Sequence, residues 1–275
     1  NYQDPKGAEY FNKGELIEQV PHLVQIRNLG TNEVITWSSE EYDDPILQFI
    51  TFFLAKDERQ YIYFHNGSSF DAQLTYNSIV NNIGEICIKN IKTGGMIIEG
   101  CKIKKLTFGN AVILDSLLHL KESLDGLPSM LEFDLDAFEE KYGFKPKKTH
   151  FPYTFATLEN LDYTGTLPPI KYYGIERLRG DARSKLELWH KEESARVKDH
   201  WNLRRTYLEY LNIDTAILAE AVIRYRQLCL DTGMIEPIGV VTLPALCLRS
   251  FKELYMEENT IPILRSFPEA SHLKY

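Results

Sequence analysis

The feature that most constrains this 275-residue chain is an alternation of short β-rich runs with helical stretches across its first 120 residues. Turn-forming residues bound the β-rich runs, and the helical stretches place apolar residues three or four positions apart. Strands interspersed with helices indicate an α/β domain with a mixed sheet flanked by helices. The pattern predicts a hairpin from residues 21–26 and 33–37, helices over 45–54 and 71–81, and strands over 61–64, 85–91, 95–99, 102–108 and 111–114.

The second half of the chain is mainly helical on both sides of a long irregular stretch. Residues 128–142 have helical spacing, whereas 145–174 are rich in proline, lysine and aromatic residues without a clear period. Such a stretch is long for a connection inside a compact domain, so we expect a functional loop or a family-specific insertion. Residues 181–229 indicate two helices with Gly233 as the C-terminal stop, and 245–255 contain one more helical piece.

Composition and charge exclude several classes of protein. With 44% apolar and 25% charged residues the chain can bury a core, which excludes disordered, collagen-like and coiled-coil proteins. No run approaches the ~18 apolar residues of a membrane span, so we expect a soluble, intracellular protein with no membrane partner. A net charge of −8 argues against coating nucleic acid with the whole surface but still allows a local basic groove. The cysteines lack metal-binding or disulfide spacing and are expected to be reduced: Cys87, Cys101, Cys229 and Cys247.

The first candidate site follows the strand predicted at residues 61–64, in the sequence YIYFHNGSSFDAQL. Asp71 stands at the head of the next helix, above a strand end, where α/β sheets bind ligands. A structural alternative is that residues 66–69 form an ordinary turn and that Asp71 caps the helix. These residues alone leave both interpretations open.

The second candidate site is the helical sequence YLEYLNIDTAIL at residues 207–218. Tyr210 and Asp214 are four residues apart and therefore share one helix face. An aspartate on the inward face of an apolar helix is costly unless it has a partner or a metal. The alternative is an exposed tyrosine and carboxylate pair on a surface helix.

Together these two segments resemble motifs of a known family. The pattern Asn66-x-x-x-Phe70-Asp71 resembles the second exonuclease motif of the proofreading domain of family B DNA polymerases, and Tyr210-x-x-x-Asp214 resembles the third. Residues 114–120, LDSLLHL, resemble the element that contacts single-stranded DNA in protein-primed members.

Three further segments extend the resemblance along most of the chain. Residues 148–152, KTHFP, resemble the lysine-containing element near the cleavage site of these enzymes. Residues 151–174 resemble an insertion in the polymerases of Maverick/Polinton transposons and related viruses and linear plasmids. Residues 233–263 are similar to their segment leading into the polymerase palm.

The resemblance implies a ribonuclease-H-like exonuclease fold whose N-terminal strand is missing from this chain. It implies a partial 3′–5′ exonuclease domain over residues 1–231, with a family insertion at about 145–200, and a truncated lead-in to the palm over 232–275. The intact parent would copy DNA, excise mispaired 3′ ends and start synthesis from a terminal priming protein.

The resemblance also implies the chemistry of the site. Such sites bind two divalent metals, and hard carboxylate ligands suit Mg²⁺ or Mn²⁺. Asp71 and Asp214 would be metal ligands, Tyr210 would orient the attacking water, and Lys148 would neutralise a phosphate. Contacts to the 3′ end of single-stranded DNA would come from His65, Asn66, Phe70, Ser116 and Leu117.

The chain departs from the family at the first exonuclease motif. No Asp-x-Glu occurs in these 275 residues, and the chain does not begin with Met, so we expect a fragment that lacks two of the four carboxylates and most catalysis. The palm motifs are also missing, so the chain as written would not synthesise DNA. The alternative is a catalytically dead transposon-derived remnant that binds single-stranded nucleic acid.

Basic and aromatic clusters leave a choice between DNA contact and ordinary structure. The lysine-rich residues 102–105 and 145–148 would line a phosphate groove or form solvated surface. Aromatic residues of the second half, Tyr172, Tyr173, Trp189 and Trp201, would stack on bases or belong to the core, which is the commoner case.

Overall fold

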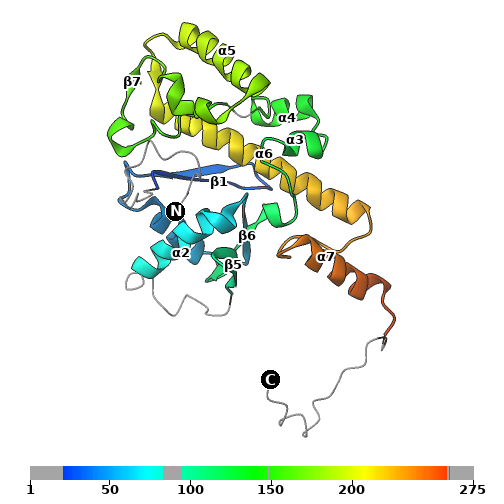
Figure 1. Cartoon of the computed structure of the whole chain (residues 1–275). Helices are drawn as coiled ribbons and strands as arrows, with labels where there is room; N and C mark the ends of the chain where they lie inside the picture. Colours follow the sequence, from blue (N-terminus) through cyan, green and yellow to red (C-terminus); the bar gives the residue numbers. More distant parts are fainter. Residues whose placement is uncertain (1–20, 83–94, 148, 259, 261–275) are drawn as a thin grey trace.

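The computed structural model describes residues 21–82, 95–147, 149–258 and 260. In this part of the chain an N-terminal hairpin lies between the long helix α6 and a layer that contains helices α1 and α2 (Figure 1). A separate mixed sheet packs on the same α1 and α2 layer. The predicted strand at 85–91 falls outside the described residues.

The hairpin consists of β1 (Leu23–Arg27) and β2 (Val34–Ser38), which pair antiparallel. The side chains of β1 alternate between two neighbours, as strand geometry requires. Val24 and Ile26 pack against the apolar core that includes α1. Gln25 and Arg27 point to the opposite face, where they bond Thr215 and Asn212 of α6. The predicted hairpin is therefore confirmed, and both of its faces are covered.

The larger sheet has the strand order β3-β6-β5-β4. Its strands are β3 (Gln60–Phe64), β4 (Ile97–Glu99), β5 (Lys102–Phe108) and β6 (Ala111–Asp115). β3 and β6 run parallel, whereas β6 pairs antiparallel with β5, and β5 with β4. All five residues of β6 are buried. This arrangement confirms the predicted mixed sheet flanked by helices.

Helices α1 (Pro45–Leu54) and α2 (Asp71–Asn81) have the bounds that the sequence predicts. Asp44 caps α1 by accepting a hydrogen bond from the Leu47 amide at 3.0 Å. Its other carboxylate oxygen accepts from the Ser78 hydroxyl of α2 at 2.8 Å. One aspartate therefore ends one helix and fixes the second helix beside it.

The prediction of one helix over residues 128–142 is wrong. The structure contains α3 (Leu127–Met130) and α4 (Leu135–Tyr142) instead. Glu132 adopts a left-handed backbone with φ 49°, which interrupts the helical path. Asp134 then starts a new helix by accepting from the amides of Asp136 and Ala137. Apolar spacing continues across the break, so periodicity alone could not reveal it.

The described residues of the irregular stretch after α4 form only short elements, as its lack of a period indicates. These are the 3-10 turns η4 (Leu158–Asn160), η5 (Ile170–Tyr173) and η6 (Ile175–Arg177) and the two-residue strand β7 (Thr164–Gly165). β7 pairs with β8 (Trp201–Asn202), which precedes α6. The apolar core shared by this stretch and the start of α6 includes Phe151, Leu167, Trp201 and Leu203. The stretch is therefore a packed unit on the start of α6.

Two helices, α5 (Gly180–Val197) and α6 (Leu203–Asp231), occupy the region where two are predicted. α6 ends at Asp231, and Gly233, whose φ is +76°, adopts the left-handed conformation that commonly follows a helix. The amide of Met234 there donates to the Cys229 carbonyl at 2.9 Å. The last described helix is α7 (Leu243–Ser250), which continues into a π-helical turn at Phe251–Tyr255. Among the helices described, none combines the length and hydropathy that crossing a bilayer requires.

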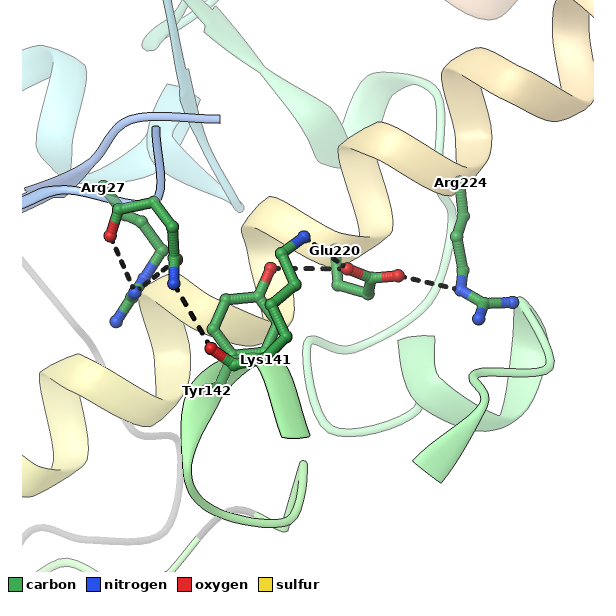
Figure 2. A network of polar contacts seen from close by, with 6 residues as sticks. Arg27, Lys141, Tyr142, Glu220 and Arg224 are labelled. Atoms are coloured by element: carbon green, nitrogen blue, oxygen red, sulfur yellow. Dashed lines mark hydrogen bonds and ion pairs between the residues drawn. The ribbon is translucent and has the colours of Figure 1, made fainter. Parts of the chain in front are cut away.

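A partly buried network of hydrogen bonds and ion pairs centred on Glu220 joins α4 to α6 (Figure 2). Glu220, whose side chain is 14% exposed, accepts from Lys141 at 3.0 Å, Tyr142 at 3.3 Å and Arg224 at 3.1 Å. The Arg27 guanidinium of the hairpin lies 5.2 Å from the centre of the Tyr142 ring. The network therefore fixes the hairpin, α4 and α6 relative to one another.

Replacing Glu220 with alanine is expected to lower the free energy of unfolding by about 2 kcal/mol, because three donors lose one half-buried acceptor. Urea denaturation of the wild type and the variant measures this difference. Glu187→Ala is the matched control, since Glu187 pairs with Arg183 in a surface i,i+4 contact and is 50% exposed. Equal losses in the two variants would contradict the role assigned to the network.

Candidate functional site

The loop after β3 has a backbone conformation that few types of residue can adopt. Asn66 lies in the left-handed region with φ 64°, which asparagine tolerates better than most residues. At Gly67 an added Cβ would lie 2.4 Å from the Phe64 Cβ, so no other residue fits without movement. The 3-10 turn η1 (Gly67–Ser69) follows and leads directly into α2. The sequence Asn-Gly therefore turns the chain sharply at the strand end.

A buried carboxylate at the end of β6 holds this loop in place. Asp115 is 3% exposed and lies opposite Phe64 in the parallel β3–β6 register. Its Oδ1 accepts from the Asn66 amide at 2.9 Å, and its Oδ2 accepts from the Ser68 amide at 3.0 Å and the Ser68 hydroxyl at 2.5 Å. Its Oδ1 also accepts from the Leu117 amide at 2.9 Å. We call this set of four hydrogen bonds the Asp115 clamp.

The clamp brings together two segments that the sequence analysis singled out separately. The parallel strands β3 and β6 end at the same edge of the sheet, so the loop after β3 and the turn η3 (Ser116–Leu118) become neighbours. The side chains at this edge are those predicted to contact DNA: His65, Asn66, Phe70, Ser116 and Leu117. We call this region the strand-end site.

Ser116 and His65 form a second link across the strand-end site. The Ser116 hydroxyl oxygen lies 2.9 Å from the His65 Nδ1 and 2.9 Å from the Phe64 carbonyl oxygen. The His65 Nε2 lies 2.8 Å from the Glu122 carbonyl, and since a carbonyl only accepts, Nε2 is the donor. Ser116 is 3% exposed, so it holds the loop from beneath, whereas Phe70 is 38% exposed and open to a ligand.

Asp71 lies in the first turn of α2, next to Phe70. The alternative in which Asp71 caps the helix is wrong, because the cap position is Phe70 and carries no side-chain hydrogen bond. Burial, and to a lesser extent the nearby Asp115 charge, raises the pKa of the Asp71 carboxyl above its usual 3.8. Asp71 is therefore a carboxylate in surroundings that disfavour its own negative charge.

Tyr210 and Asp214 lie on one face of α6 and are half-buried, so the alternative of an exposed pair is wrong. Tyr210 packs on Phe151 with 5.0 Å between ring centres, and its hydroxyl lies 2.7 Å from the Tyr153 hydroxyl. Burial raises the pKa of Tyr210, and the neighbouring Asp214 carboxylate raises it further. The Tyr210 hydroxyl therefore keeps its proton at neutral pH and serves as a hydrogen-bond donor.

The structure pairs Tyr210 with Asp214 and places Asp71 at the strand-end site. Among the residues with described positions, no three His, Cys, Asp or Glu side chains form a cluster that could hold a metal ion. Lys148 lies outside the described residues. In the two lysine-rich stretches, Lys104 pairs with Glu99, and Lys145 lies 3.6 Å from Glu139, which is a surface contact.

Sequence reasoning missed two residues of this region. Asp115 lies in the segment LDSLLHL but was not predicted as a site residue, although an aspartate directly after four apolar strand residues signals a buried carboxylate that needs donors. Tyr153 was not predicted either, because no local pattern could pair it with Tyr210, which is 57 residues away. The structure shows both sets of contacts, those of Asp115 with backbone amides and that of Tyr153 with Tyr210.

Changing Asp115 to asparagine is expected to lower the free energy of unfolding by about 3 kcal/mol, because the new amide group opposes the donors of Ser68. Urea denaturation measures the loss. Asp134→Asn is the control, since Asp134 also accepts from two backbone amides but is exposed, and asparagine caps a helix as well as aspartate does. A loss at Asp115 no larger than at Asp134 would show that the clamp is not needed for stability.

Changing Asp71 to asparagine is expected to raise the melting temperature at pH 7 in metal-free buffer. The raised pKa means that the folded protein binds the Asp71 proton more tightly than the unfolded chain does. The wild type therefore loses stability as the pH rises from 3.8 through the raised pKa, and the asparagine variant does not. The gain in melting temperature should grow across this window and be largest above it.

Thermal unfolding between pH 3.5 and 8 checks the prediction for Asp71, with EDTA present throughout. Asp136→Asn is the control, because Asp136 also lies in the first turn of a helix but is exposed. A gain in melting temperature that is independent of pH, or one equal to that of the control, would contradict the burial argument.

Comparisons with known proteins place this chain in a family. Residues 53–272 match the family described as DNA polymerase type B, organellar and viral. Three relatives, each called a probable DNA polymerase, are 26% identical to this chain. They come from Neurospora intermedia (90% of this chain and 24% of the relative), Podospora anserina (50% and 11%) and Agaricus bitorquis (74% and 23%).

The chain spans about a quarter or less of the length of these relatives. No solved structure matches it. The family match nevertheless covers most of the chain, including both α2 and α6. The chain therefore belongs to the type B DNA polymerases of organelles and viruses.

Proposed function

We propose that this chain is the proofreading region of a type B DNA polymerase. In this proposal residues 1–231 form a ribonuclease-H-like 3′–5′ exonuclease domain, and 232–275 lead into the polymerase palm. The observation that carries the proposal is the Asp115 clamp, which joins the loop of the second exonuclease motif to the Ser-Leu element for single-stranded DNA. Two segments of related expected function, 47 to 49 residues apart, thereby meet at one strand end.

The proposed substrate is the 3′ end of single-stranded DNA at the strand-end site. Phe70 offers an exposed ring on which a base can stack, a contact of ~1–3 kcal/mol. Asn66 is exposed beside it, with its backbone held by the clamp. Ser116 is buried and acts by orienting His65. The site therefore combines one stacking surface with polar groups on a rigid loop.

The donor set is suited to Mg²⁺ or Mn²⁺, with Asp71 and Asp214 as the proposed ligands. Asp71 fits a cation because burial and a neighbouring carboxylate both disfavour its charge, and a bound cation would reverse this penalty. When bound, such ions supply Lewis-acid stabilisation of a phosphoryl group and lower the pKa of a water molecule. We propose that the remaining carboxylates come from an Asp-x-Glu motif that these 275 residues lack.

Tyr210 is proposed to orient the attacking water through its protonated hydroxyl. Its contacts with Phe151 and with the Tyr153 hydroxyl limit the positions that this group can adopt. Lys148 is proposed to neutralise a phosphate of the strand.

The priming mechanism is a further part of the proposal. The insertion at about 145–200 resembles that of protein-primed polymerases of Maverick/Polinton transposons, viruses and linear plasmids. We propose that the parent enzyme starts synthesis from a terminal protein. This region of the chain packs as a unit on the start of α6, which supports a dedicated function for it.

A second candidate function is single-strand binding without hydrolysis, as in a transposon-derived remnant. One observation favours it: the described residues contain no cluster of three side chains that could hold a metal. A nuclease assay on single-stranded DNA separates the two functions.

The test follows 5′-labelled single-stranded DNA with Mn²⁺ over time. It compares the longest polypeptide that the encoding gene yields with the 275-residue chain. We expect the longer polypeptide to shorten the strand stepwise from its 3′ end, and Asp71→Ala with Asp214→Ala to slow this by at least about 100-fold. The 275-residue chain should be slower by a similar factor, because it lacks two carboxylates.

Asp136→Ala is the control, since it removes an exposed carboxylate from the first turn of α4. Internal cleavage, or 3′ shortening that survives the double substitution, would contradict the proposed site. Binding of the strand by both polypeptides without any shortening would support the second candidate function.

A further inference from the structure

A cavity of about 330 Å³ lies between α5 and the first turns of α6, apart from the strand-end site. Its walls come from the segment before Phe151, from the second half of α5 and from residues 200–209. The volume is within the range of small-molecule sites in proteins. We call it the α5–α6 cavity, and nothing in the proposed exonuclease reaction uses it.

One wall of the cavity is aromatic. The rings of His150 and Trp189 lie 4.7 Å apart between centres, and the centre of the Tyr173 ring lies 5.3 Å from that of Trp189. Burial lowers the pKa of His150, so the ring is neutral at pH 7 and contributes a flat face rather than a charge. Trp201, which is 5% exposed, also lines the cavity. Such a surface suits the flat face of a nucleobase.

The charged groups of the cavity are balanced. Arg196 bonds Glu193 through Nε at 2.8 Å and Nη2 at 2.5 Å, and Arg205 bonds Glu209 through Nε at 2.7 Å. The Arg205 side chain is 76% exposed, so a ligand can reach its terminal nitrogens. Two arginines beside two glutamates suit the single charge of a phosphodiester better than the several charges of a free nucleoside triphosphate.

The cavity adjoins the proposed reaction site through two short links. Thr206 lines the cavity and is four residues before Tyr210, which places them on one face of α6 about 6 Å apart along the axis. His150 lines the cavity and is followed by Phe151, which packs on Tyr210. A strand held near Tyr210 can therefore continue into the cavity.

We propose that the α5–α6 cavity binds one nucleotide of single-stranded DNA, with the base stacked on Trp189 and the phosphodiester at Arg205. This inference rests on the proposed function only in taking the same strand as its ligand. It assigns to the irregular insertion and α5 a second contact with that strand. The contact supplies affinity mainly by stacking, because the charges of the cavity are already paired.

The test measures fluorescence anisotropy of a 5′-fluorescein-labelled decathymidylate in EDTA, so that hydrolysis cannot occur. Trp189→Ala should weaken binding about 10-fold, and Trp189→Phe, which keeps an aromatic face, should stay within about 3-fold of the wild type. An abasic decamer should bind the wild type and Trp189→Ala equally. Arg205→Ala should reduce the slope of log affinity against log salt by about 0.7, which corresponds to one phosphate contact.

Arg249→Ala is the matched control, because Arg249 also pairs with a glutamate four residues later but lies on α7. Free thymidine monophosphate distinguishes a nucleotide ligand from a strand: it should compete at least 10-fold more weakly than the decamer. Circular dichroism confirms that each variant is folded. Should Trp189→Ala fail to fold, Trp189→Phe and the exposed Arg205→Ala decide the outcome.

Three results would each overturn the proposal. The first is wild-type affinity in folded Trp189→Ala, and the second is an unchanged salt slope in Arg205→Ala. The third is no binding of the decamer at roughly 1 mM protein. Equal competition by the monophosphate would also overturn it in favour of a free nucleotide. The double variant Asp71→Ala, Asp214→Ala should keep its affinity for the decamer. Absence of 3′ shortening by the unsubstituted longer polypeptide, with Trp189-dependent binding retained, would therefore refute the proposed function alone.

Discussion

The strand-end site depends on one interaction, the burial of the Asp115 carboxylate beneath two turns. A charged group in such a position is stable only when donors surround it, and here three backbone amides and one hydroxyl do so. Because the donors come from the loop after β3 and the turn after β6, their positions are fixed by a single acceptor. The same charge contributes to the raised pKa of Asp71, so the clamp shapes the electrostatics of the site as well as its geometry.

Helix α6 provides the second fixed element. Along its 29 residues it lines the α5–α6 cavity, then contacts the hairpin, and then joins the Glu220 network. Tyr210 and Asp214 lie between the cavity and the network. The irregular insertion adds a third constraint, since its aromatic residues pack directly on Tyr210.

Much of the architecture could be predicted from local signals. The helix at residues 45–54 was predicted with its observed bounds, because the apolar spacing starts after an acidic run that contains its cap, Asp44. The hairpin, the mixed sheet and the Gly233 stop were predicted on similar grounds. The break at Glu132 was missed, because it depends on one backbone conformation that leaves the apolar pattern intact.

The candidate site was less predictable, because its contacts connect distant parts of the sequence. The motif residues were recognised by spacing, yet the clamp pairs Asp115 with amides 47 and 49 residues earlier, and spacing carries no sign of backbone donors. Among the aromatic residues of the second half, Trp201 is core, and Trp189 is half-buried and packs against the same core at the wall of the α5–α6 cavity. Whether such residues stack on bases stays a prediction.

Synthesis on the ribosome separates the hairpin from its partner helix in time. The hydrogen bonds Gln25–Thr215 and Arg27–Asn212 join residues 190 and 185 positions apart. At ~5–20 residues per second, translation takes roughly 10–40 s to travel that distance. An isolated two-stranded hairpin is marginal in water, so β1 and β2 leave the ribosome well before α6 can cover their polar face. During this interval the hairpin is exposed to aggregation and to chaperone binding.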